Sequence, residues 1–534
     1  MPKDALKSAW HKADSARQQV LDRARLCSAL TKPWVLPPES MAKNDALPEP
    51  FSSLAARGIT NLEGRLLLAL YPPGLPFFRL KPAAKYRLDP SVDPNILGQF
   101  EQHLFLRELA ILSKLEQTDR PKTTNTRRAG FRSRKRTSLS QLLITGDTLE
   151  MLTDDYQIKV FRRDQYCTGR DSSGGVQFHI IKEHIDPLSL SPKQLELLEI
   201  DVDSTLEKSS QDRKEDMYTM VEWEPMSKRW CIKQEVKGVI IEESEEKVNP
   251  FMSTPFELAP GEDYGRGLIE VNLGDVRSMN SLTERILDFA ATASKQLFVL
   301  DYNSQVRASD LAKPSGSVIQ ARVAAGQVVD ISTLKVDKMS DFSIVGQTRE
   351  AIRRDLSAVM LMEGESTPRG DRVTAYQVQR VAMELEGALG GVYAPIADSM
   401  QIGLIERIMY QMKRDKAMQP LPDDSVEIEA VTGIAALSRE SDQGKLVGVL
   451  QTIAQLGPET LARIDKGILL DLMMRQAGVY QAGLIKTNEQ INAEMQAAQE
   501  AQTKAQAGQQ LIQSAGKVAE QNMTPESIGA MANG

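Results

Sequence analysis

An apolar stripe between residues 381 and 408 constrains the fold of this chain more than any other feature of its sequence. Its members recur at helical spacings of three and four: Val381, Leu385, Leu389, Val392, Ile396, Met400, Leu404 and Ile408. The pattern predicts about 40 helical residues, roughly 60 Å, with a bend at Gly390, Gly391 and Pro395. Such a helix does not fit inside one small domain, so we expect it to span domains or pack against neighbouring subunits. A single chain would then expose the stripe as an apolar patch.

Length and charge narrow the classes of protein that fit. The chain has 534 residues, which corresponds to about three to four domains. Apolar residues make up 41% and charged residues 26%, a composition typical of a folded soluble protein. The 72 acidic side chains outnumber the 65 basic ones, so the surface as a whole does not attract a phosphate backbone. Any contact with DNA is therefore expected to be local.

Cysteine usage and apolar runs indicate the compartment. Cys27, Cys167 and Cys231 are odd in number and far apart, which argues against a disulfide framework and predicts buried thiols in a reducing cytoplasm. The first twenty residues carry charges throughout and do not resemble a signal peptide. The longest charge-free apolar run, residues 66–78, has three prolines and is too short to span a bilayer. We expect no membrane association.

No motif for catalysis is visible, and we predict no catalytic, cofactor-binding or metal-binding residue. The chain lacks the phosphate-loop pattern G-x-x-x-x-G-K-[ST]. The glycine-rich string GEDYGRG, residues 261–267, has no lysine and is interpreted as a loop that leads into a helix. His179 and His184 have neither the spacing nor the companion ligands of a metal site. The sequence therefore does not favour an enzyme.

One basic cluster leaves two interpretations open. It lies in TNTRRAGFRSRKR and consists of Arg127, Arg128, Arg132, Arg134, Lys135 and Arg136. Such a cluster can contact phosphates or an acidic partner. A solvated basic loop that leads into a helix is the interpretation we favour.

The first half of the chain predicts an α+β domain. Apolar periodicity predicts helices at 4–30, 54–70, 96–115, 138–144 and 188–200. Short apolar runs between turn clusters predict antiparallel strands within 148–181 and 217–241.

The second half is predominantly helical in its pattern. We expect helices at 267–297 and 342–362, with short strands between them, and a charged connection after the second helix. A strand at 425–433 and helices at 438–456 and 459–476 follow the apolar stripe. The Ala- and Gln-rich end has high helix propensity but little to bury, which suits a tube made of many copies.

Four strings together resemble the portal, or head-to-tail connector, proteins of short-tailed double-stranded DNA bacteriophages. AARGITNLEGRLLLALYPP is similar to a wing helix of the family, and DYGRGLIEVNLGDVRSMNSL to the segment that opens a stem helix. GDRVTAYQVQRVAMELEGALGGVYAPI is similar to the long helix, and EIEAVTGIAALSRESD to the segment after it. The strings follow the family's order and cover much of residues 50–440.

The resemblance implies an α+β, predominantly helical portal fold, assembled as a ring. In chain order its parts would be a wing (1–265), a stem helix (266–296), a clip (297–337), a second stem helix (338–362), a tunnel loop (363–372), a long wing helix with its following strand (373–430), a crown (431–484), and an Ala/Gln-rich helical barrel or tail (485–534).

The same resemblance implies a function and partners. A homo-oligomeric ring of about twelve copies would sit at one vertex of the capsid in the virion, after assembly in the host cytoplasm. Double-stranded DNA would pass through its channel, regardless of sequence, during packaging and ejection. The partners would be the large terminase, a tail adaptor protein, and the major capsid and scaffolding proteins.

The resemblance also nominates residues. The candidates for lining the DNA channel are Glu363, Glu365, Arg369, Asp371 and Arg372. The candidates for oligomer contacts or helix packing are Val381, Leu385, Leu389, Val392, Ile396, Leu282, Ile286 and Phe289. Around a ring, the two arginines of the loop would touch phosphates transiently while its carboxylates limit the affinity. Without the resemblance, this loop would be interpreted as a solvent-exposed turn between helices.

Two other classes stay open at this point. One is a virion adaptor or scaffold protein that forms no ring, which the oligomeric state distinguishes. The other is a subunit of a DNA-processing enzyme, which would need a phosphate loop or clustered metal-binding carboxylates.

We expect a chain that lacks residues 485–534 to assemble as the full chain does, because this segment has few large apolar side chains with which to bind a neighbour. Light scattering on the truncated and full chains measures this. Loss of assembly in the truncated chain would show that the oligomer contacts lie in the Ala- and Gln-rich end.

Overall fold

The computed structural model describes most of residues 4–431. The residues outside the description are 1–3, 40, 42–44, 74–75, 88, 90–93, 120–129, 201–208, 210–212, 294–296, 301, 303–305, 308, 310–312, 315, 319, 326, 330, 335–338, 363–374, 390, 419–420, 423 and 432–534. The chain consists of two compact units, residues 1–437 and residues 438–534. All of the described residues belong to the first unit. The helices predicted at 438–456 and 459–476, the crown and the barrel lie outside the described residues.

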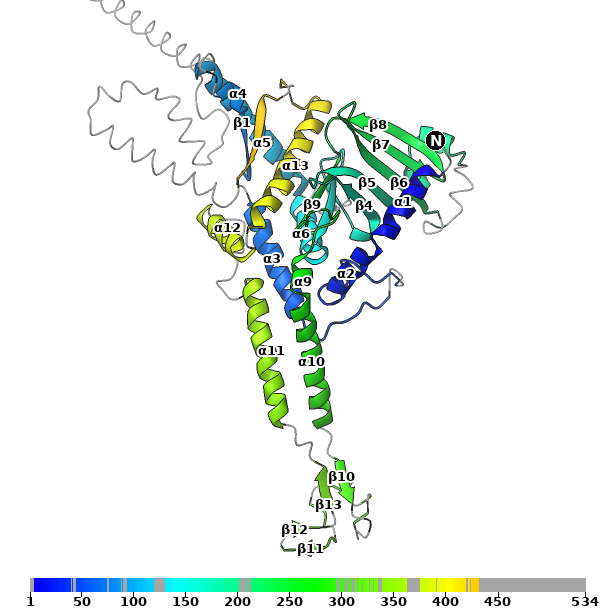
Figure 1. Ribbon diagram of the computed structural model, residues 1–534, viewed down its shortest axis with the longest axis vertical. Helices are drawn as coiled ribbons and strands as arrows, with labels where there is room; N and C mark the ends of the chain where they lie inside the picture. Colours follow the sequence, from blue (N-terminus) through cyan, green and yellow to red (C-terminus); the bar gives the residue numbers. More distant parts are fainter. Residues whose placement is uncertain are drawn as a thin grey trace, which may run out of the picture. The chain divides into compact units, whose positions relative to one another are not determined.

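A helix near the N-terminal end of the chain, α3 (Leu54–Leu70), organises the helical core (Figure 1). Its apolar positions Ile59, Leu62, Leu66 and Leu70 recur every three or four residues and are all buried. It packs against α6 (Phe131–Thr145), α11 (Met339–Val359) and α12 (Ala375–Leu389). The prediction of a helix at 54–70 is confirmed.

The apolar stripe forms two helices, α12 and α13 (Tyr393–Arg414), rather than one bent rod. The chain turns between them at Gly391, whose φ is 86°. Val392 is half-buried, and the other stripe residues are buried inside the chain: Val381, Leu385, Leu389, Ile396, Met400, Leu404 and Ile408. The chain changes direction where the bend was predicted, but the single helix of about 40 residues is replaced by two. The expectation that a single chain exposes this stripe is wrong, because α3 and neighbouring elements of the same chain cover it.

The two largest sheets among the described strands of this unit are both antiparallel. Strands β3, β2 and β9 make one sheet, and β4 to β8 make a five-stranded meander in chain order. Their bounds are β2 (Asp147–Leu152), β3 (Ile158–Phe161), β4 (Tyr166–Arg170), β5 (Val176–Ile185), β6 (Glu215–Glu224), β7 (Arg229–Val236), β8 (Val239–Glu246) and β9 (Phe251–Pro255). The strands predicted in 148–181 and 217–241 are confirmed, and the architecture is α+β.

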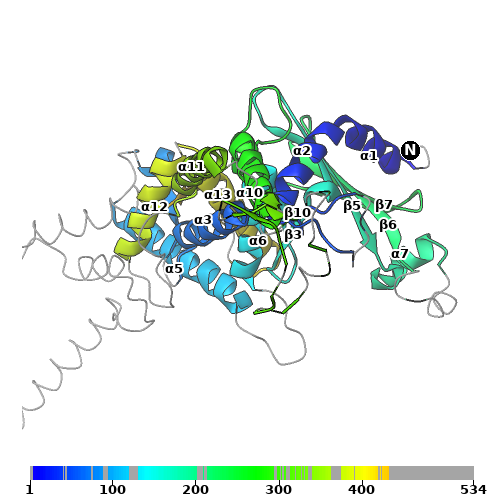
Figure 2. The same cartoon turned by 90° about the horizontal axis from the view of Figure 1, so that it is seen from below.

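Each face of the meander has its own apolar partner. Helix α1 (Ala5–Ala16) covers one face, where Leu6 and Trp10 pack against Ile180 and Tyr218 (Figure 2). Another cluster joins the meander to the three-stranded sheet through Leu149, Phe161, Tyr166, Ile181, Val221 and Phe251.

The N-terminal helix is broken, contrary to the prediction of one helix over 4–30. Helix α1 ends at Ala16 and α2 (Gln18–Ala29) begins two residues later. Arg17, between them, is buried and donates hydrogen bonds from its guanidinium to the carbonyl oxygens of Arg163, Asp164 and Tyr166. The break therefore follows from a long-range contact that local periodicity does not reveal.

The helices α10 (Leu273–Ala293) and α11 pack side by side (Figures 1 and 2). The single helix predicted over 267–297 is divided into α9 (Leu268–Val271) and α10, and the helix predicted at 342–362 is α11. Strands predicted between them are present as two antiparallel pairs. These are β10 (Leu297–Leu300) with β13 (Ile331–Leu334), and β11 (Val323–Ala324) with β12 (Gln327–Val328).

The remaining elements connect distant parts of the sequence. Strand β1 (Phe78–Pro82) pairs with β14 (Val426–Ala430), the strand predicted at 425–433. Helix α5 (Pro94–Asp119) extends the helix predicted at 96–115, and α4 (Ala84–Arg87) is a single turn. The helix predicted at 188–200 is shorter, α7 (Pro192–Leu197).

The cysteines and the apolar helices test the predictions about disulfides and membrane association. Cys27 and Cys167 are buried as predicted, but Cys231, on β7, is partly exposed. Among the described helices, none combines the length and apolar character needed to cross a membrane.

Three glycines bring the start of α9 against the end of α6. Gly146, which follows α6, has a φ of 82°. A Cβ there would lie 2.2 Å from the Gly265 oxygen and 2.6 Å from the Gly267 nitrogen. The string GEDYGRG is thus a loop that leads into a helix, as predicted, and its glycines permit a close backbone approach.

We expect Gly146→Ala to lower the free energy of unfolding by about 2–5 kcal/mol, because it adds left-handed strain and a backbone clash. Gly261→Ala is a matched control, since Gly261 also has a φ of 82° but has open space around its Cβ position. It should cost only about 1–2 kcal/mol. Urea unfolding of both variants measures the difference, and equal losses would contradict the close-packed junction.

Candidate functional site

The described chain brackets the segment that sequence analysis nominated for DNA contact. Glu363, Glu365, Arg369, Asp371 and Arg372 themselves lie outside the described residues. Before the segment stand the end of α11 and residues 360–362, and after it stands α12. We call the contacts that hold these two ends the loop base.

Asn61 of α3 binds the end of α11. Its side-chain amide donates to the carbonyl oxygens of Met360 (3.1 Å) and Leu361 (2.8 Å). Carbonyls just beyond a helix lack partners within the helix, so this amide satisfies acceptors that would otherwise need water.

The end of α11 is a strained helix cap. Leu361 has a φ of 51°, in the left-handed region where a side chain is unfavourable. The amide of Leu361 donates to the Ala358 oxygen, and that of Met362 donates to the Ser357 oxygen. This is the Schellman arrangement that usually has glycine at the left-handed position. The bonds from Asn61 therefore stabilise a backbone turn that is costly on its own.

Gly58 makes room for the same turn. Met360 is fully buried against α3. A Cβ on residue 58 would lie 2.0 Å from the Met360 sulfur and 2.9 Å from its Cβ. The glycine at this buried helix position therefore allows α11 to approach α3 closely.

Arg65 fixes the other end of the segment. Its guanidinium forms an ion pair with Glu384 of α12, which also receives a bond from Arg380. Arg65 is buried, so the pair is less screened by solvent than one on the surface. Val381 and Leu385 of α12 are buried in the core that includes Leu62 and Leu66. One helix, α3, thus holds both ends of residues 363–374.

The charges on α10 and α11 nearly balance. Their sequences contain six acidic residues and five arginines: Asp275, Glu284, Asp288, Asp341, Glu350, Asp355, Arg277, Arg285, Arg349, Arg353 and Arg354. Arg353 is held by Glu350 at 2.7–2.9 Å. The candidates Leu282, Ile286 and Phe289 are only half-buried on α10, unlike most of those on α12 and α13.

The described part of the basic cluster, residues 132–136, lies in helix α6 and not in a solvated loop. Arg127 and Arg128 lie outside the described residues, but α6 already begins at Phe131. Lys135 is fully buried, with its Nζ 2.6 Å from a Glu150 carboxylate oxygen and over the Tyr71 ring. Burial alone would lower the pKa of Lys135, but Glu150 and Tyr71 beside it raise it overall.

Two further arginines of this cluster serve the fold. Arg136 pairs with Glu63 at 3.3 Å, and the Arg132 guanidinium donates to the backbone carbonyl oxygen of Tyr71. Glu63 is buried, and a buried carboxylate persists when it is paired in this way. For residues 132–136 the expectation of a solvated loop is therefore wrong, because they are helical and these two arginines bind partners from a distant part of the sequence.

The two histidines on β5 face different surroundings. His179 is buried beside Thr168, and burial lowers its pKa to about 3. His184 is exposed, with its Nδ1 2.6 Å from Asp216. In the part of the chain that the structure describes, no group of three His, Cys, Asp or Glu side chains is arranged to hold a metal.

Sequence reasoning missed the loop base. It singled out the string that contains Gly58 and Asn61 only for its resemblance and gave these residues no role. Gly58 and Asn61 lie on the apolar side of an otherwise regular helix, and neither residue type favours a helix interior. This was the one sequence signal that could have indicated a special contact there.

Comparisons with known proteins place this geometry in context. The profile of a family described as bacteriophage head to tail connecting protein matches residues 3–485. The portal protein of Escherichia phage T7 is 26% identical over 547 residues, which cover 100% of this chain and 97% of that protein. The portal protein of Enterobacteria phage T3 is also 26% identical, over 92% of this chain and 90% of its own.

Two more distant similarities complete the comparison. The portal protein of Pseudomonas phage phiKMV is 24% identical over 94% of this chain and 96% of its own. A solved neck of an empty GTA particle aligns over 79% of this chain and 89% of that chain, at 9% identity and a TM-score of 0.36. A structural likeness this weak supports no conclusion.

We expect Gly58→Ala to destabilise the chain by about 1–2 kcal/mol, because the clash with Met360 exceeds the gain in helix propensity. Gly64→Ala, on the same helix with open space at its Cβ position, should instead stabilise it by about 0.5–1 kcal/mol. Denaturant unfolding gives both values. A stabilising effect at both positions would refute the tight contact at the loop base.

Stability should also fall as the pH falls from about 6.5 toward 3. The unfolded chain binds a proton on His179 in this range while the folded chain, with its lowered pKa, does not. The contribution approaches about 1.4 kcal/mol per pH unit. Comparing the unfolding of the native chain and His179→Gln from pH 7.5 to 4.5 isolates it, and a constant difference between them would contradict a buried neutral imidazole.

Proposed function

The chain belongs to the bacteriophage head to tail connecting protein family, and on that premise we propose that its copies form the portal ring of a phage capsid. The main support for this proposal is the similarity along nearly the whole chain to the portal proteins of phages T7 and T3. We propose twelve subunits at one vertex of the virion, assembled in the host cytoplasm. DNA enters and leaves through the axial channel.

The contacts of the loop base support the assignment of residues 363–372 as the loop that lines the channel. Copies of the 363–372 segment, each held at both ends by its own α3, would meet around the ring axis. Glu363, Glu365, Arg369, Asp371 and Arg372 are then the residues that touch the passing DNA. A fixed base keeps the twelve loops at the same height, which a uniform constriction requires.

The charge balance supports passage rather than retention of DNA. Each phosphate that a protein neutralises adds salt-dependent affinity. Two arginines among three carboxylates in the loop, and the near balance on α10 and α11, avoid a strongly basic channel wall. The ring would therefore contact phosphates transiently and without reading sequence.

We assign the remaining parts by the same proposal. Residues 1–265 and 373–430 form the wing, α9 to α10 and α11 form the stem, and 297–337 form the clip. The clip is the docking platform for the large terminase and then for a tail adaptor protein. The wing contacts the major capsid and scaffolding proteins, and residues 431–534 form the crown and barrel.

Oligomer contacts are expected on surfaces that a single chain leaves exposed. The half-buried Leu282, Ile286 and Phe289 of α10 remain candidates, together with Leu287 and Ile344, which are 53% and 63% exposed. The apolar stripe on α12 and α13 is buried within each chain and is therefore not available for contacts between copies. Closed rings form from such heterologous contacts when the rotation between copies closes.

The proposal is tested by the mass and shape of the purified protein. Twelve copies of 59.2 kDa give about 710 kDa, and negative-stain electron microscopy should show rings with an axial hole. Light scattering should report the same mass. A compact monomer under all assembly conditions would contradict the portal proposal and favour a non-ring adaptor.

A further inference from the structure

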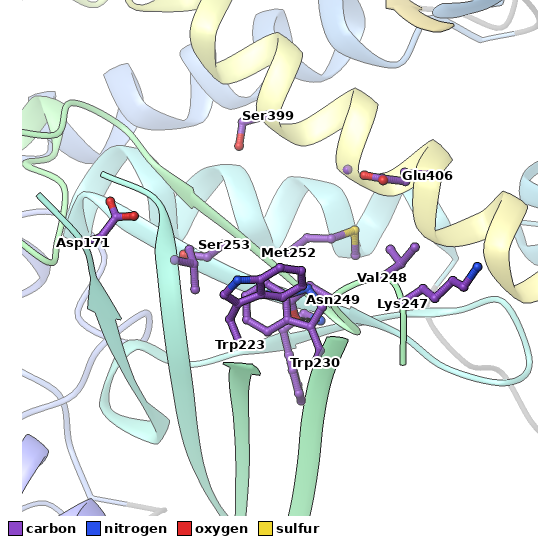
Figure 3. Close-up of a pocket in the computed structure, with 13 residues that line it drawn as sticks. Asp171, Trp223, Trp230, Lys247, Val248, Asn249, Met252, Ser253, Ser399 and Glu406 are labelled. Carbon is purple, nitrogen blue, oxygen red and sulfur yellow. Dashed lines mark hydrogen bonds between the residues drawn. The ribbon is translucent and has the colours of Figure 1, made fainter. Parts of the chain in front are cut away.

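A pocket of about 540 Å³ lies where the ends of β6 and β7 approach β9 and α13 (Figure 3). Its wall combines two indole rings, Trp223 and Trp230, with two carboxylates, Asp171 and Glu406. None of the contacts at the loop base involves this pocket, and no residue in it was singled out by the sequence.

The indole rings form a cross-strand pair. Trp223 and Trp230 are opposite each other in the ladder of β6 and β7, with ring centroids 5.3 Å apart and planes inclined by 54°. Both side chains are only half-buried, although Trp230 touches the cluster between the two sheets. The pair therefore presents aromatic surface to the pocket instead of filling it. The faces of indole rings carry negative electrostatic potential, which attracts cations.

Glu406 contributes a carboxylate without a partner. The structure gives it neither an ion pair nor a hydrogen bond to any described residue, and desolvation by its surroundings raises its pKa. A carboxylate in this position gains stability when a cation approaches it.

Asp171 adds a second negative charge. Its carboxylate accepts bonds from Ser173 and Gly175, which lower its pKa and keep it ionised. The thirteen lining residues include one basic side chain, Lys247, which has an interaction of its own. The pocket thus has an excess of negative charge beside an aromatic pair.

We propose that this pocket binds an alkylammonium or alkylguanidinium cation. The charged group lies against the Trp223 and Trp230 rings and within reach of Glu406, and its alkyl stem lies along Met252 and Val248. Two sources supply this chemistry, namely a lysine or arginine of a neighbouring copy in the ring, or a free polyamine. The first source rests on the proposed function, whereas the site itself does not.

The test uses n-butylguanidinium as the probe and n-butylurea as its uncharged near-isostere. Isothermal titration of the purified, unassembled chain should detect the cation and not the urea. Glu406→Gln should weaken cation binding at least tenfold, without loss of folding, because Glu406 has no hydrogen bond or ion pair to lose among the described residues. Glu222→Gln, an exposed carboxylate next to Trp223 that does not line the pocket, is the matched control and should bind as the native chain does.

Three results would overturn the proposal. These are no binding of the cation, equal binding of the urea, or equal effects of Glu406→Gln and Glu222→Gln. Trp230→Phe provides a second check, because it keeps an aromatic ring with a weaker cation affinity and should reduce binding less than Trp230→Leu.

Repeating the titration on assembled rings distinguishes the two sources. If rings no longer bind n-butylguanidinium, a basic side chain of a neighbouring copy fills the pocket. If rings and unassembled chains bind it equally, the ligand is a free cation, and spermidine should compete with the probe. The first titration does not need rings, so the failure of this inference and the failure of the proposed function give different results.

Discussion

The burial of the α12–α13 stripe inside its own chain is the constraint on which the rest of this structure depends. Its leucines, isoleucines and methionines belong to one continuous core with those of α3 and α6. Burying each such side chain contributes about 1.5–3 kcal/mol, so the stripe is a major part of the stability of the helical core. Helices α3 and α6 come from the N-terminal part of the described chain, and α12 and α13 come from its C-terminal part. The N-terminal part therefore cannot complete its core without the stripe.

The same packing positions the loop base. Once α12 lies against α3, Arg65 reaches Glu384, and Asn61 and Gly58 lie beside the end of α11. The two ends of the nominated channel segment are therefore held by a rigid element rather than by other loops. The glycine contact between Gly146 and the start of α9 fixes α10 to the sheet region in a similar way. In the proposed ring, such attachments would keep the dimensions of the channel constant while DNA moves through it.

Local patterns in the sequence predicted most of the elements. Helix 54–70 was predicted because its leucines are periodic and prolines follow it, and the sheet strands because turn clusters separate them. The partners of these elements were not predictable. The sequence around Lys135 does not indicate that Glu150 is its buried partner. The sequence around Arg17 does not indicate the carbonyl groups that it binds where the N-terminal helix breaks.

The candidate site shows the same limit. Periodicity reveals the apolar stripe but not which surface covers it, and this is why the expectation that a single chain exposes the stripe is wrong. The roles of Gly58 and Asn61 depend on contacts with residues about 300 positions away. The resemblance to portal proteins supplies the proposed function and the proposed boundaries of the parts, whereas the structure supplies the contacts within the described residues.

Hydrogen exchange of the backbone amides of residues 381–389 and 393–408 tests the central claim most directly. It should be measured by mass spectrometry on unassembled chains and on assembled rings. Because the stripe is covered within each chain, we predict slow exchange in both states, with protection that differs by less than about tenfold. Fast exchange in the unassembled chain, with protection only in the ring, would contradict the account and make the stripe an interface between subunits.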